Sequence, residues 1–209
     1  AGDRAATAFP RLYVDADIEL DTASARALVE ALRTDGVLAV APTRDLRLDG
    51  SAWAVRAYYR VWDRLPAVRD GLHGRGVLGV NEAGFARIAD RPELIGDDLY
   101  LHSRFAPTER RVVPQSRSVV RGPRTVGDLM RRRTRAAQAN TQLGTRTSGE
   151  TVTTGSSGRE LARLARSEPR LWPSLAVFVT VTVVARCRAW WLQRRGSAGV
   201  WLRDESSRA

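Results

Sequence analysis

The fold class is decided by residues 11–41, which read RLYVDADIELDTASARALVEALRTDGVLAVA. The apolar run within 11–18 predicts a buried strand that ends in acidic residues. Apolar residues at helical spacing predict a helix over 22–34, and a second apolar run over 37–41, closed by Pro42, predicts another strand. Because a strand, a helix and a strand follow in this order, we expect a right-handed crossover and a parallel sheet in an α/β fold.

The same patterns outline the rest of the chain. They predict helices over 52–64, 97–105, 125–143 and 159–168, a strand over 76–80 and an extended segment over 111–120. Thr22 or Ser24 is expected to cap the first helix. Thr125 is expected to cap the helix over 125–143, with Asp128 at its third position as in a capping box.

Composition divides the chain into three parts. Residues 1–143 carry the alternating pattern and form the predicted α/β domain. Residues 144–158 consist largely of Gly, Ser and Thr and are typical of a flexible linker. Residues 159–209 form a C-terminal tail, helical or apolar, for which membrane association is one expectation.

The tail contains the most apolar stretch, residues 171–185, which read LWPSLAVFVTVTVVA. This stretch is shorter than a standard spanning helix of roughly 20 residues. Its Val and Thr content is typical of a buried strand, whereas the flanking Trp190, Trp191 and arginines are typical of an interfacial anchor. Core packing and membrane contact therefore stay open as alternatives.

The charge and composition of the chain limit the classes of partner that are expected. The net charge is +11, and every basic residue is arginine, which forms forked contacts with phosphate and carboxylate groups. Proteins that bind single-stranded nucleic acid combine basic side chains with aromatic ones. No aromatic residue lies between Phe105 and Trp172, where the arginine-rich helix over 125–143 is predicted, so nucleic acid is not an expected partner. The single cysteine, Cys187, excludes an internal disulfide, and a reducing compartment is expected.

Two acidic pairs are the strongest candidates for chemistry. Asp15 and Asp17 follow the first apolar run, and Asp97 and Asp98 follow Leu94-Ile95-Gly96. Carboxylates two residues apart on a strand project from one face and can hold a hard divalent cation. A second acidic pair can supply a base, and a metal with a base suits a phosphate-bearing substrate.

Other residues attract attention by their spacing. Arg132 and Arg135 lie one helical turn apart within the run Arg131 to Arg135, which suits a diphosphate clamp or a solvated helix face. His102 lies four residues after Asp98, and this spacing allows a metal or proton role besides a plain surface or core position. Gly76 belongs to a Gly-x-Gly-x-x-Gly run that enters an extended segment, where glycine is typical of close backbone approach.

The order of these motifs resembles the second half of a glycosyltransferase family 2 catalytic domain, which has the GT-A fold. The resemblance covers roughly residues 1–143 and rests on order and spacing. The motifs are Asp15-Ala16-Asp17, Tyr58-Tyr59-Arg60-Val61-Trp62, Gly74-Arg75-Gly76-Val77, Asn81-Glu82-Ala83-Gly84-Phe85, Arg91-Pro92-Glu93-Leu94-Ile95-Gly96-Asp97-Asp98-Leu99 and Asp128 to Arg135. The resemblance implies a partial GT-A-like, Rossmann-like mixed sheet flanked by helices.

The resemblance also implies roles. Asp17, supported by Asp15, would bind Mg²⁺ or Mn²⁺ and the diphosphate of a nucleotide-sugar donor. Asp98, with Asp97 as its acidic neighbour, would be the general base for inversion at the anomeric carbon. Arg132 and Arg135 would meet the donor diphosphate, and Gly76 and His102 would lie on the acceptor side.

Two departures from the family pattern qualify the expected activity. The family often carries Gln-x-x-Arg-Trp where this chain has Arg132 to Ala136, so a processive polysaccharide synthase is not expected. Such domains also begin with a nucleotide-binding half, whereas this chain reaches Asp15 almost at once. We therefore expect either a fragment or a chain that has lost this half, and in both cases one that is inactive alone.

The expected acceptor is a polysaccharide or a lipid-linked hydroxyl compound. The expected location is cytoplasmic, at the inner face of the plasma membrane if the tail is an anchor, with the membrane surface as a further partner. One rival interpretation is a haloacid-dehalogenase-like Mg²⁺-dependent phosphatase that uses Asp15, Asp17, Asp97 and Asp98. The lysine that such phosphatases use is missing here. A second rival is a non-enzymatic, arginine-rich module that binds anionic surfaces.

Overall fold

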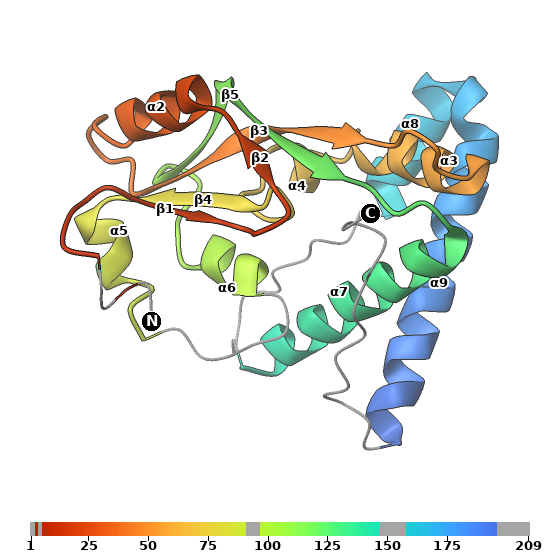
Figure 1. Cartoon of the computed structure of the whole chain (residues 1–209). Coiled ribbons are helices and arrows are strands. Elements are labelled where there is room, and N and C mark those ends of the chain that lie inside the picture. Colours follow the sequence, from red (N-terminus) through yellow and green to blue (C-terminus); the bar gives the residue numbers. More distant parts are fainter. Residues whose placement is uncertain (1–2, 4–5, 91–96, 147–157, 196–209) are drawn as a thin grey trace. The chain divides into compact units, whose positions relative to one another are not determined.

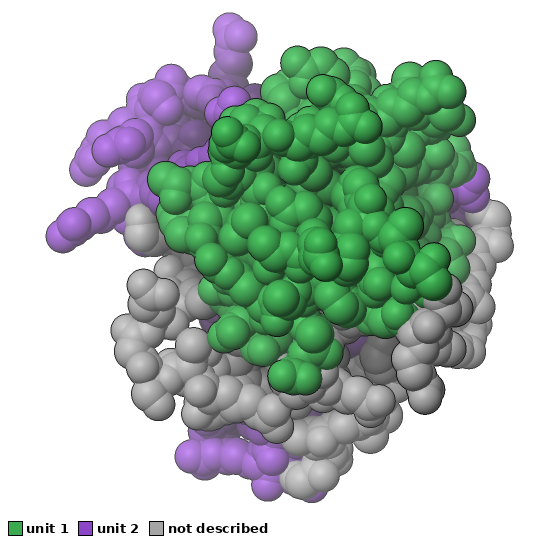
Figure 2. Space-filling view, turned by 90° about the vertical axis from the view of Figure 1, so that its left-hand side faces the viewer, with its two compact units in different colours: residues 1–47, 72–92, 100–120 green, residues 48–71, 93–99, 121–209 purple. Residues whose placement is uncertain are grey.

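The computed structural model describes residue 3 and residues 6–90, 97–146 and 158–195 (Figure 1). The chain divides into two compact units, which Figure 2 shows in different colours. Unit 1 comprises residues 1–47, 72–92 and 100–120, and unit 2 comprises residues 48–71, 93–99 and 121–209. Residues on both sides of the predicted linker at 144–158 thus belong to unit 2, and most of that linker lies outside the described residues.

Unit 1 is built on a five-stranded mixed sheet. Its strands are β1 (Arg11–Val14), β2 (Glu19–Leu20), β3 (Ala39–Arg47), β4 (Val77–Val80) and β5 (Arg110–Arg121), in the spatial order β1-β4-β3-β5-β2. β4 pairs antiparallel with both β1 and β3, and β2 pairs antiparallel with β5. The contacts between β3 and β5 advance in the same direction along both strands, from Leu38 and Glu109 to Thr43 and Val113.

The sheet is curled into a half-barrel, and the connection between β1 and β2 requires this shape. These two strands form opposite edges, which would lie about 19 Å apart in a flat sheet at the usual strand spacing. They are nevertheless joined by residues 15–18 alone, within which the Ile18 amide donates to the Asp15 carbonyl at 3.1 Å. A turn this tight cannot span a flat sheet, so the edges curl toward each other.

Helices cover both faces of this sheet. α2 (Thr22–Ala31) lies on one face, and α5 (Glu82–Ala86) and α6 (Asp97–Ser103) lie on the other (Figure 1). The alternation of side chains along each strand separates two apolar clusters. The cluster beneath α2 consists of Leu28, Leu32, Val37, Val40, Val77 and Val113, and the cluster on the other face consists of Ala39, Ala41, Leu72, Leu78, Val80, Ile88, Leu101 and Phe105.

Unit 2 is helical among its described residues. It contains α3 (Trp53–Trp62), α4 (Pro66–Arg69), α7 (Val126–Arg146), α8 (Gly158–Ser167), a 3₁₀ turn (Pro169–Leu171) and α9 (Trp172–Arg194). α9 packs against α3 and α7, and the ring of Tyr58 in α3 stacks on that of Phe178 in α9, with centroids 4.9 Å apart. Thr125 and Asp128 form the predicted capping box of α7, in which Asp128 N–H donates to Thr125 Oγ1 at 3.1 Å.

The predicted mixed α/β architecture with flanking helices is confirmed, but several details were wrong. The sheet is not parallel: β1 and β3 run parallel to each other, yet β4 lies between them and is antiparallel to both. The predicted strand over 11–18 is half-buried and ends at Val14. β3 continues through Pro42 to Arg47, because its register with β4 involves only Ala39 and Val40, ahead of the proline.

Two further local predictions were wrong. The cap of α2 is Asp21, whose Oδ1 accepts from the Ser24 amide at 2.6 Å. The alternative of a buried strand within 171–185 is excluded, because Trp172–Arg194 form one helix. Among the described residues, one segment, Pro169–Arg194, is long and apolar enough to cross a membrane, judged by length and a mean hydropathy of 1.5 alone.

Candidate functional site

The Asp15-Ala16-Asp17 motif forms the turn that closes the curled sheet of unit 1. β1 ends at Val14, and Ala16 and Asp17 are turn residues, so the expectation that Asp15 and Asp17 share one face of a strand was wrong. Both aspartates are exposed. Because the turn connects the two edges of the half-barrel, its backbone position is fixed from both sides by the pairing of β1 with β4 and of β2 with β5.

Gly76 lies directly against this turn. The Asp15 amide donates to the Gly76 carbonyl at 2.9 Å, which extends the β1–β4 ladder by one pair beyond Val14 and Val77. Gly76 has a φ of +66°, and a Cβ at this position would lie 2.3 Å from Ile18 Cγ1 and 3.4 Å from Asp15 Oδ2. Glycine is therefore required here for two reasons, its positive φ and the close approach of Ile18. A close approach at this glycine was predicted from the sequence.

The loop that carries Gly76 is held by buried polar contacts. The Arg75 side chain is buried and donates through Nη1 to the Pro42 carbonyl in β3 at 3.0 Å. The hydroxyl of Ser118, in β5, donates to the Arg75 carbonyl at 2.8 Å. Three strands thus fix the backbone beside the aspartate turn. Sequence reasoning missed Arg75 and Ser118, since nothing in the pattern marked one arginine among many as buried.

The donor set at the turn suits a cation that shares its ligands with a phosphate compound. The described residues contain no group of three or more His, Cys, Asp or Glu side chains placed to hold a metal. Asp15 and Asp17 supply two carboxylates, and Mg²⁺ is commonly held by one or two carboxylates together with substrate phosphates. The turn therefore fits a metal bound with a diphosphate and does not fit an all-protein metal cage.

The other predicted acidic pair begins α6. Asp97 and Asp98 are the first residues of that helix, and the predicted helix over 97–105 is confirmed as Asp97–Ser103. Their side chains lie outside the described part of the structure, so their roles stay predictions. Acidic residues at a helix start also have a purely structural advantage, because they face the positive end of the helix dipole.

Arg132 and Arg135 lie on α7 in unit 2, and both are half-buried. Their neighbours in the basic run have structural contacts. Arg131 forms an ion pair with Asp128, and the Arg133 guanidinium lies 5.7 Å from the ring centroid of Tyr58 and 5.7 Å from that of Trp62. The diphosphate role of Arg132 and Arg135 stays a prediction.

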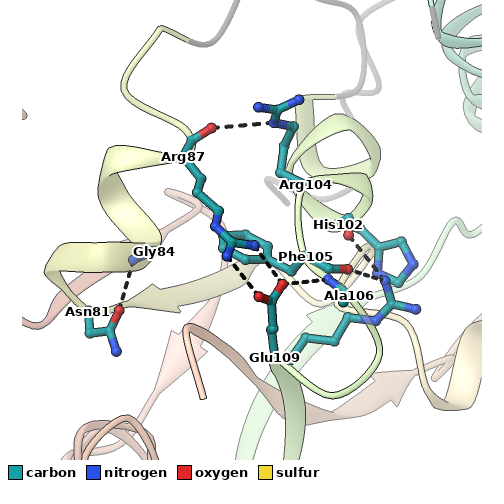
Figure 3. A network of polar contacts seen from close by, with 9 residues as sticks. Asn81, Gly84, Arg87, His102, Arg104, Phe105, Ala106 and Glu109 are labelled. Atoms are coloured by element: carbon teal, nitrogen blue, oxygen red, sulfur yellow. Dashed lines mark hydrogen bonds and ion pairs between the residues drawn. The ribbon is translucent and has the colours of Figure 1, made fainter. Parts of the chain in front are cut away.

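His102 is part of the interior of unit 1. Its Nδ1 accepts a hydrogen bond from the Leu72 amide at 3.1 Å. Its carbonyl accepts one from Arg110 Nη1 at 3.2 Å, and Figure 3 shows His102 in this surrounding. Its ring meets that of His73 edge-on, with centroids 5.1 Å apart. Burial, followed by Arg110, His73 and Arg75, lowers the pKa of His102 to about 3. The imidazole is therefore neutral at physiological pH, with Nδ1 occupied as an acceptor.

A polar network next to His102 was not anticipated. Arg87 and Glu109 form a forked ion pair with distances of 2.6 and 2.8 Å, and the Ala106 amide donates to the same carboxylate at 2.9 Å (Figure 3). Arg87 and the Ala106 amide lower the pKa of Glu109. The Leu38 amide donates to the Glu109 carbonyl at 2.7 Å. The network joins the loop before β5 to the start of β3, which indicates a structural role.

The motif Asn81 to Phe85 is explained by local structure. Asn81 caps α5 by accepting from the Gly84 amide at 2.8 Å (Figure 3). Its Nδ2 donates to the Val37 carbonyl at 2.9 Å. A Cβ on Gly84 would lie 2.3 Å from the Leu38 carbonyl oxygen. Both residues therefore hold α5 against the sheet.

Comparison with known proteins adds no name to this geometry. The chain matches no model of a known protein family and no curated protein sequence. Among the described residues, the aspartate turn with Gly76 is the best-defined candidate site.

Proposed function

We propose that this chain is the catalytic part of an inverting, metal-dependent glycosyltransferase that moves a sugar from a nucleotide-sugar donor to a hydroxyl acceptor. The observation that carries the proposal is the exposed Asp15–Asp17 turn, held against Gly76 at the closure of the curled sheet. A turn fixed from both edges of a sheet offers carboxylates in a defined position, which suits the placement of a metal–diphosphate group.

The roles follow from the chemistry of each side chain. Asp17, supported by Asp15, would hold Mg²⁺ or Mn²⁺, and a divalent cation offsets the charge that develops on a departing nucleoside diphosphate. Arg132 and Arg135 would donate charge-assisted hydrogen bonds to the diphosphate oxygens. Asp98, with Asp97 beside it, would remove the proton from the acceptor hydroxyl as this attacks the anomeric carbon.

The finer fold assignment belongs to the same proposal. A GT-A-like sheet of this partial kind is supported by the mixed pairing, by the helices on both faces and by an Asp-x-Asp turn directly after a strand. An acceptor-side position for Gly76 is supported by its place beside the turn, where its carbonyl accepts the hydrogen bond of the Asp15 amide. The neutral, hydrogen-bonded His102 is better suited to supporting this region than to transferring protons.

The phosphatase alternative is the weaker one. It needs a nucleophilic aspartate after a buried strand, whereas Asp15 follows an edge strand that is half-buried and antiparallel to its neighbour. Beryllium fluoride, which mimics an aspartyl phosphate, would bind Asp15 tightly in a phosphatase and would not do so in a glycosyltransferase.

Donor turnover tests the proposal. The chain, joined to the nucleotide-binding half that the resemblance implies, would be incubated with Mn²⁺ and a panel of uridine, guanosine and thymidine diphosphate sugars, and released nucleoside diphosphate would be measured. We expect release from at least one donor, its loss in Asp17→Asn, and its retention in Asp35→Asn, which removes an exposed acid elsewhere in unit 1. Release of inorganic phosphate from phosphomonoesters, with no turnover of any donor, would overturn the proposal.

A further inference from the structure

α9 presents an apolar stripe to solvent along most of its length. The stripe consists of Trp172, Val179, Val183, Val184, Trp190 and Trp191, whose exposed fractions range from 44% to 63%. Trp172, Val179, Val183 and Trp190 are spaced by seven, four and seven residues, so they share one side of the helix. Exposed apolar surface of this extent on a soluble domain indicates an interaction site.

The opposite side of α9 is covered. Ser174, Leu175, Phe178, Val181, Ala185 and Ala189 are buried, and this side packs against α3 and α7 of the same unit. α9 is therefore apolar on both sides, but only one side has a protein partner among the described residues. This pattern differs from that of an ordinary core helix, which is buried all round, and from that of a surface helix, whose outer side is polar.

The ends of the stripe have the composition of a membrane interface. Tryptophan stands at both ends, and the indole N–H of Trp172 donates to the Ala165 carbonyl at 2.8 Å, which satisfies its polar group. At the other end, the guanidinium of Arg194 lies 3.9 Å from the ring centroid of Trp190, and that of Arg195 lies 3.6 Å from that of Trp191. Tryptophan and arginine in this arrangement are typical of the headgroup region of a bilayer.

Positive charge near the stripe also indicates a lipid surface as the partner. Arg186 and Arg188 are exposed on α9, and Arg159, Arg163 and Arg166 are exposed on α8. The net charge of the chain is +11. Anionic lipids attract such arginine clusters next to an apolar surface.

The packing of α9 decides how the helix would meet the bilayer. By length and composition the segment Pro169–Arg194 could span a membrane, yet its covered side packs against α7. α7 carries Asp128, Arg131, Arg133 and further arginines, which would have to enter the hydrocarbon together with a spanning α9. A helix lying in the membrane plane avoids this cost, because only the stripe enters the lipid.

We propose that α9 is an in-plane anchor that inserts its exposed stripe into an anionic lipid surface while its other side stays packed in unit 2. The proposal is independent of the glycosyltransferase proposal, because it rests on the exposure of α8 and α9 and on the packing of α9 within unit 2, and it uses no acidic residue of the proposed metal or base sites.

Vesicle co-sedimentation tests the anchor. Val183→Glu places a charge on the stripe, and Val126→Glu makes the same change at an exposed valine of α7, outside the stripe and in the same unit. We expect the intact chain and Val126→Glu to bind vesicles that contain phosphatidylglycerol, and high salt to weaken this binding. We expect the affinity of Val183→Glu for these vesicles to fall by a factor of about ten or more. No binding by the intact chain at low salt, or equal losses in both variants, would overturn the proposal.

A nitroxide label on α9 gives a second test. Cys187 is the single cysteine of the chain, so in the double variant Cys187→Ser, Val183→Cys a nitroxide attached on the stripe, at the middle of Pro169–Arg194, reports depth in the bilayer. An in-plane helix predicts a depth of about 5–10 Å below the headgroups. A label near the bilayer centre would indicate a spanning helix, and a label shielded in a lipid-free dimer that does not bind vesicles would indicate a second copy of the chain. Either result would overturn the proposal.

Discussion

The Gly76 carbonyl accepts a hydrogen bond of 2.9 Å from the Asp15 amide, one residue beyond the last regular pair of β1 and β4. This contact joins two motifs that are far apart in the sequence and holds the aspartate turn at the closure of the half-barrel. Because Ile18 packs against the α-carbon of Gly76, the position tolerates no larger residue. The stability of this closure can therefore be tested separately from any activity.

Gly76→Ala should destabilise the protein more than Gly36→Ala. Both glycines have a positive φ, which costs an alanine about 1–2 kcal/mol, but a Cβ at Gly36 meets nothing within 4 Å whereas one at Gly76 overlaps Ile18. We expect an additional loss of about 1–3 kcal/mol for Gly76→Ala in chemical denaturation. Ile18→Ala should recover part of this additional loss in the double variant. Equal losses for the two glycines would show that the packing against Ile18 is not tight.

His102→Asn should flatten the dependence of stability on pH. The folded protein holds His102 neutral, with its pKa lowered to about 3, whereas an unfolded histidine titrates near the model value of 6.5. Below about pH 6.5 the His102 imidazole therefore binds a proton in the unfolded chain but not in the folded chain. Because of this difference, the free energy of unfolding falls as the pH falls. Asparagine can still accept from the Leu72 amide but does not titrate.

The measurement is the free energy of unfolding between pH 7 and pH 5. The pKa values of Asp21, Glu109 and Asp128 are lowered, so these carboxylates become protonated only below this range. We expect a smaller slope in His102→Asn than in the unchanged protein. Identical slopes would mean that His102 titrates normally and is more accessible to water than its burial indicates.

Asp98→Asn should reduce donor turnover by roughly 10²–10⁴-fold while donor binding persists, because the amide keeps the shape of the side chain and removes its basicity. Asp97→Asn is the matched comparison, since it makes the same change one residue earlier in α6. A severe loss in Asp97→Asn together with a mild one in Asp98→Asn would show that the two roles are exchanged.

Arg132→Ala and Arg135→Ala should raise the KM for the donor more than they lower kcat, if these side chains bind the donor diphosphate in both the ground state and the transition state. Arg133→Ala should behave differently, because the Arg133 guanidinium lies over the rings of Tyr58 and Trp62 inside unit 2. We expect Arg133→Ala to lower the melting temperature with little change in KM. A lowered melting temperature with an unchanged KM in Arg132→Ala and Arg135→Ala would assign these arginines to structure.

Local patterns predicted elements better than their arrangement. The capping box of Thr125 and Asp128 and the helix at Asp97 depend on neighbours along the chain, and both were predicted correctly. The curl of the sheet depends on pairs such as Leu20 with Ser118, which no local pattern contains. The Val- and Thr-rich segment of α9 has strand propensity, but its helical form places Phe178 against Tyr58.

At the candidate site, too, local features were predicted and contacts between distant segments were not. The exposed aspartates and the need for glycine at position 76 were readable from residue types and spacing. The buried Arg75, its carbonyl bond from Ser118 and the neutral state of His102 depend on strands and loops that meet only in the folded chain. Sequence reasoning therefore found the groups that could do chemistry and missed the groups that hold them.

Calorimetric titration of nucleotide-sugars into the chain joined to a nucleotide-binding half, with Mn²⁺ or with a chelator, tests the aspartate turn most directly. We expect Mn²⁺-dependent binding of one donor by the unchanged protein and by Asp35→Asn, and its loss in Asp17→Asn, because the cation would bridge that carboxylate and the diphosphate. Donor binding that is unaffected by the chelator, or binding by Asp17→Asn equal to that of Asp35→Asn, would contradict a metal–diphosphate site at this turn.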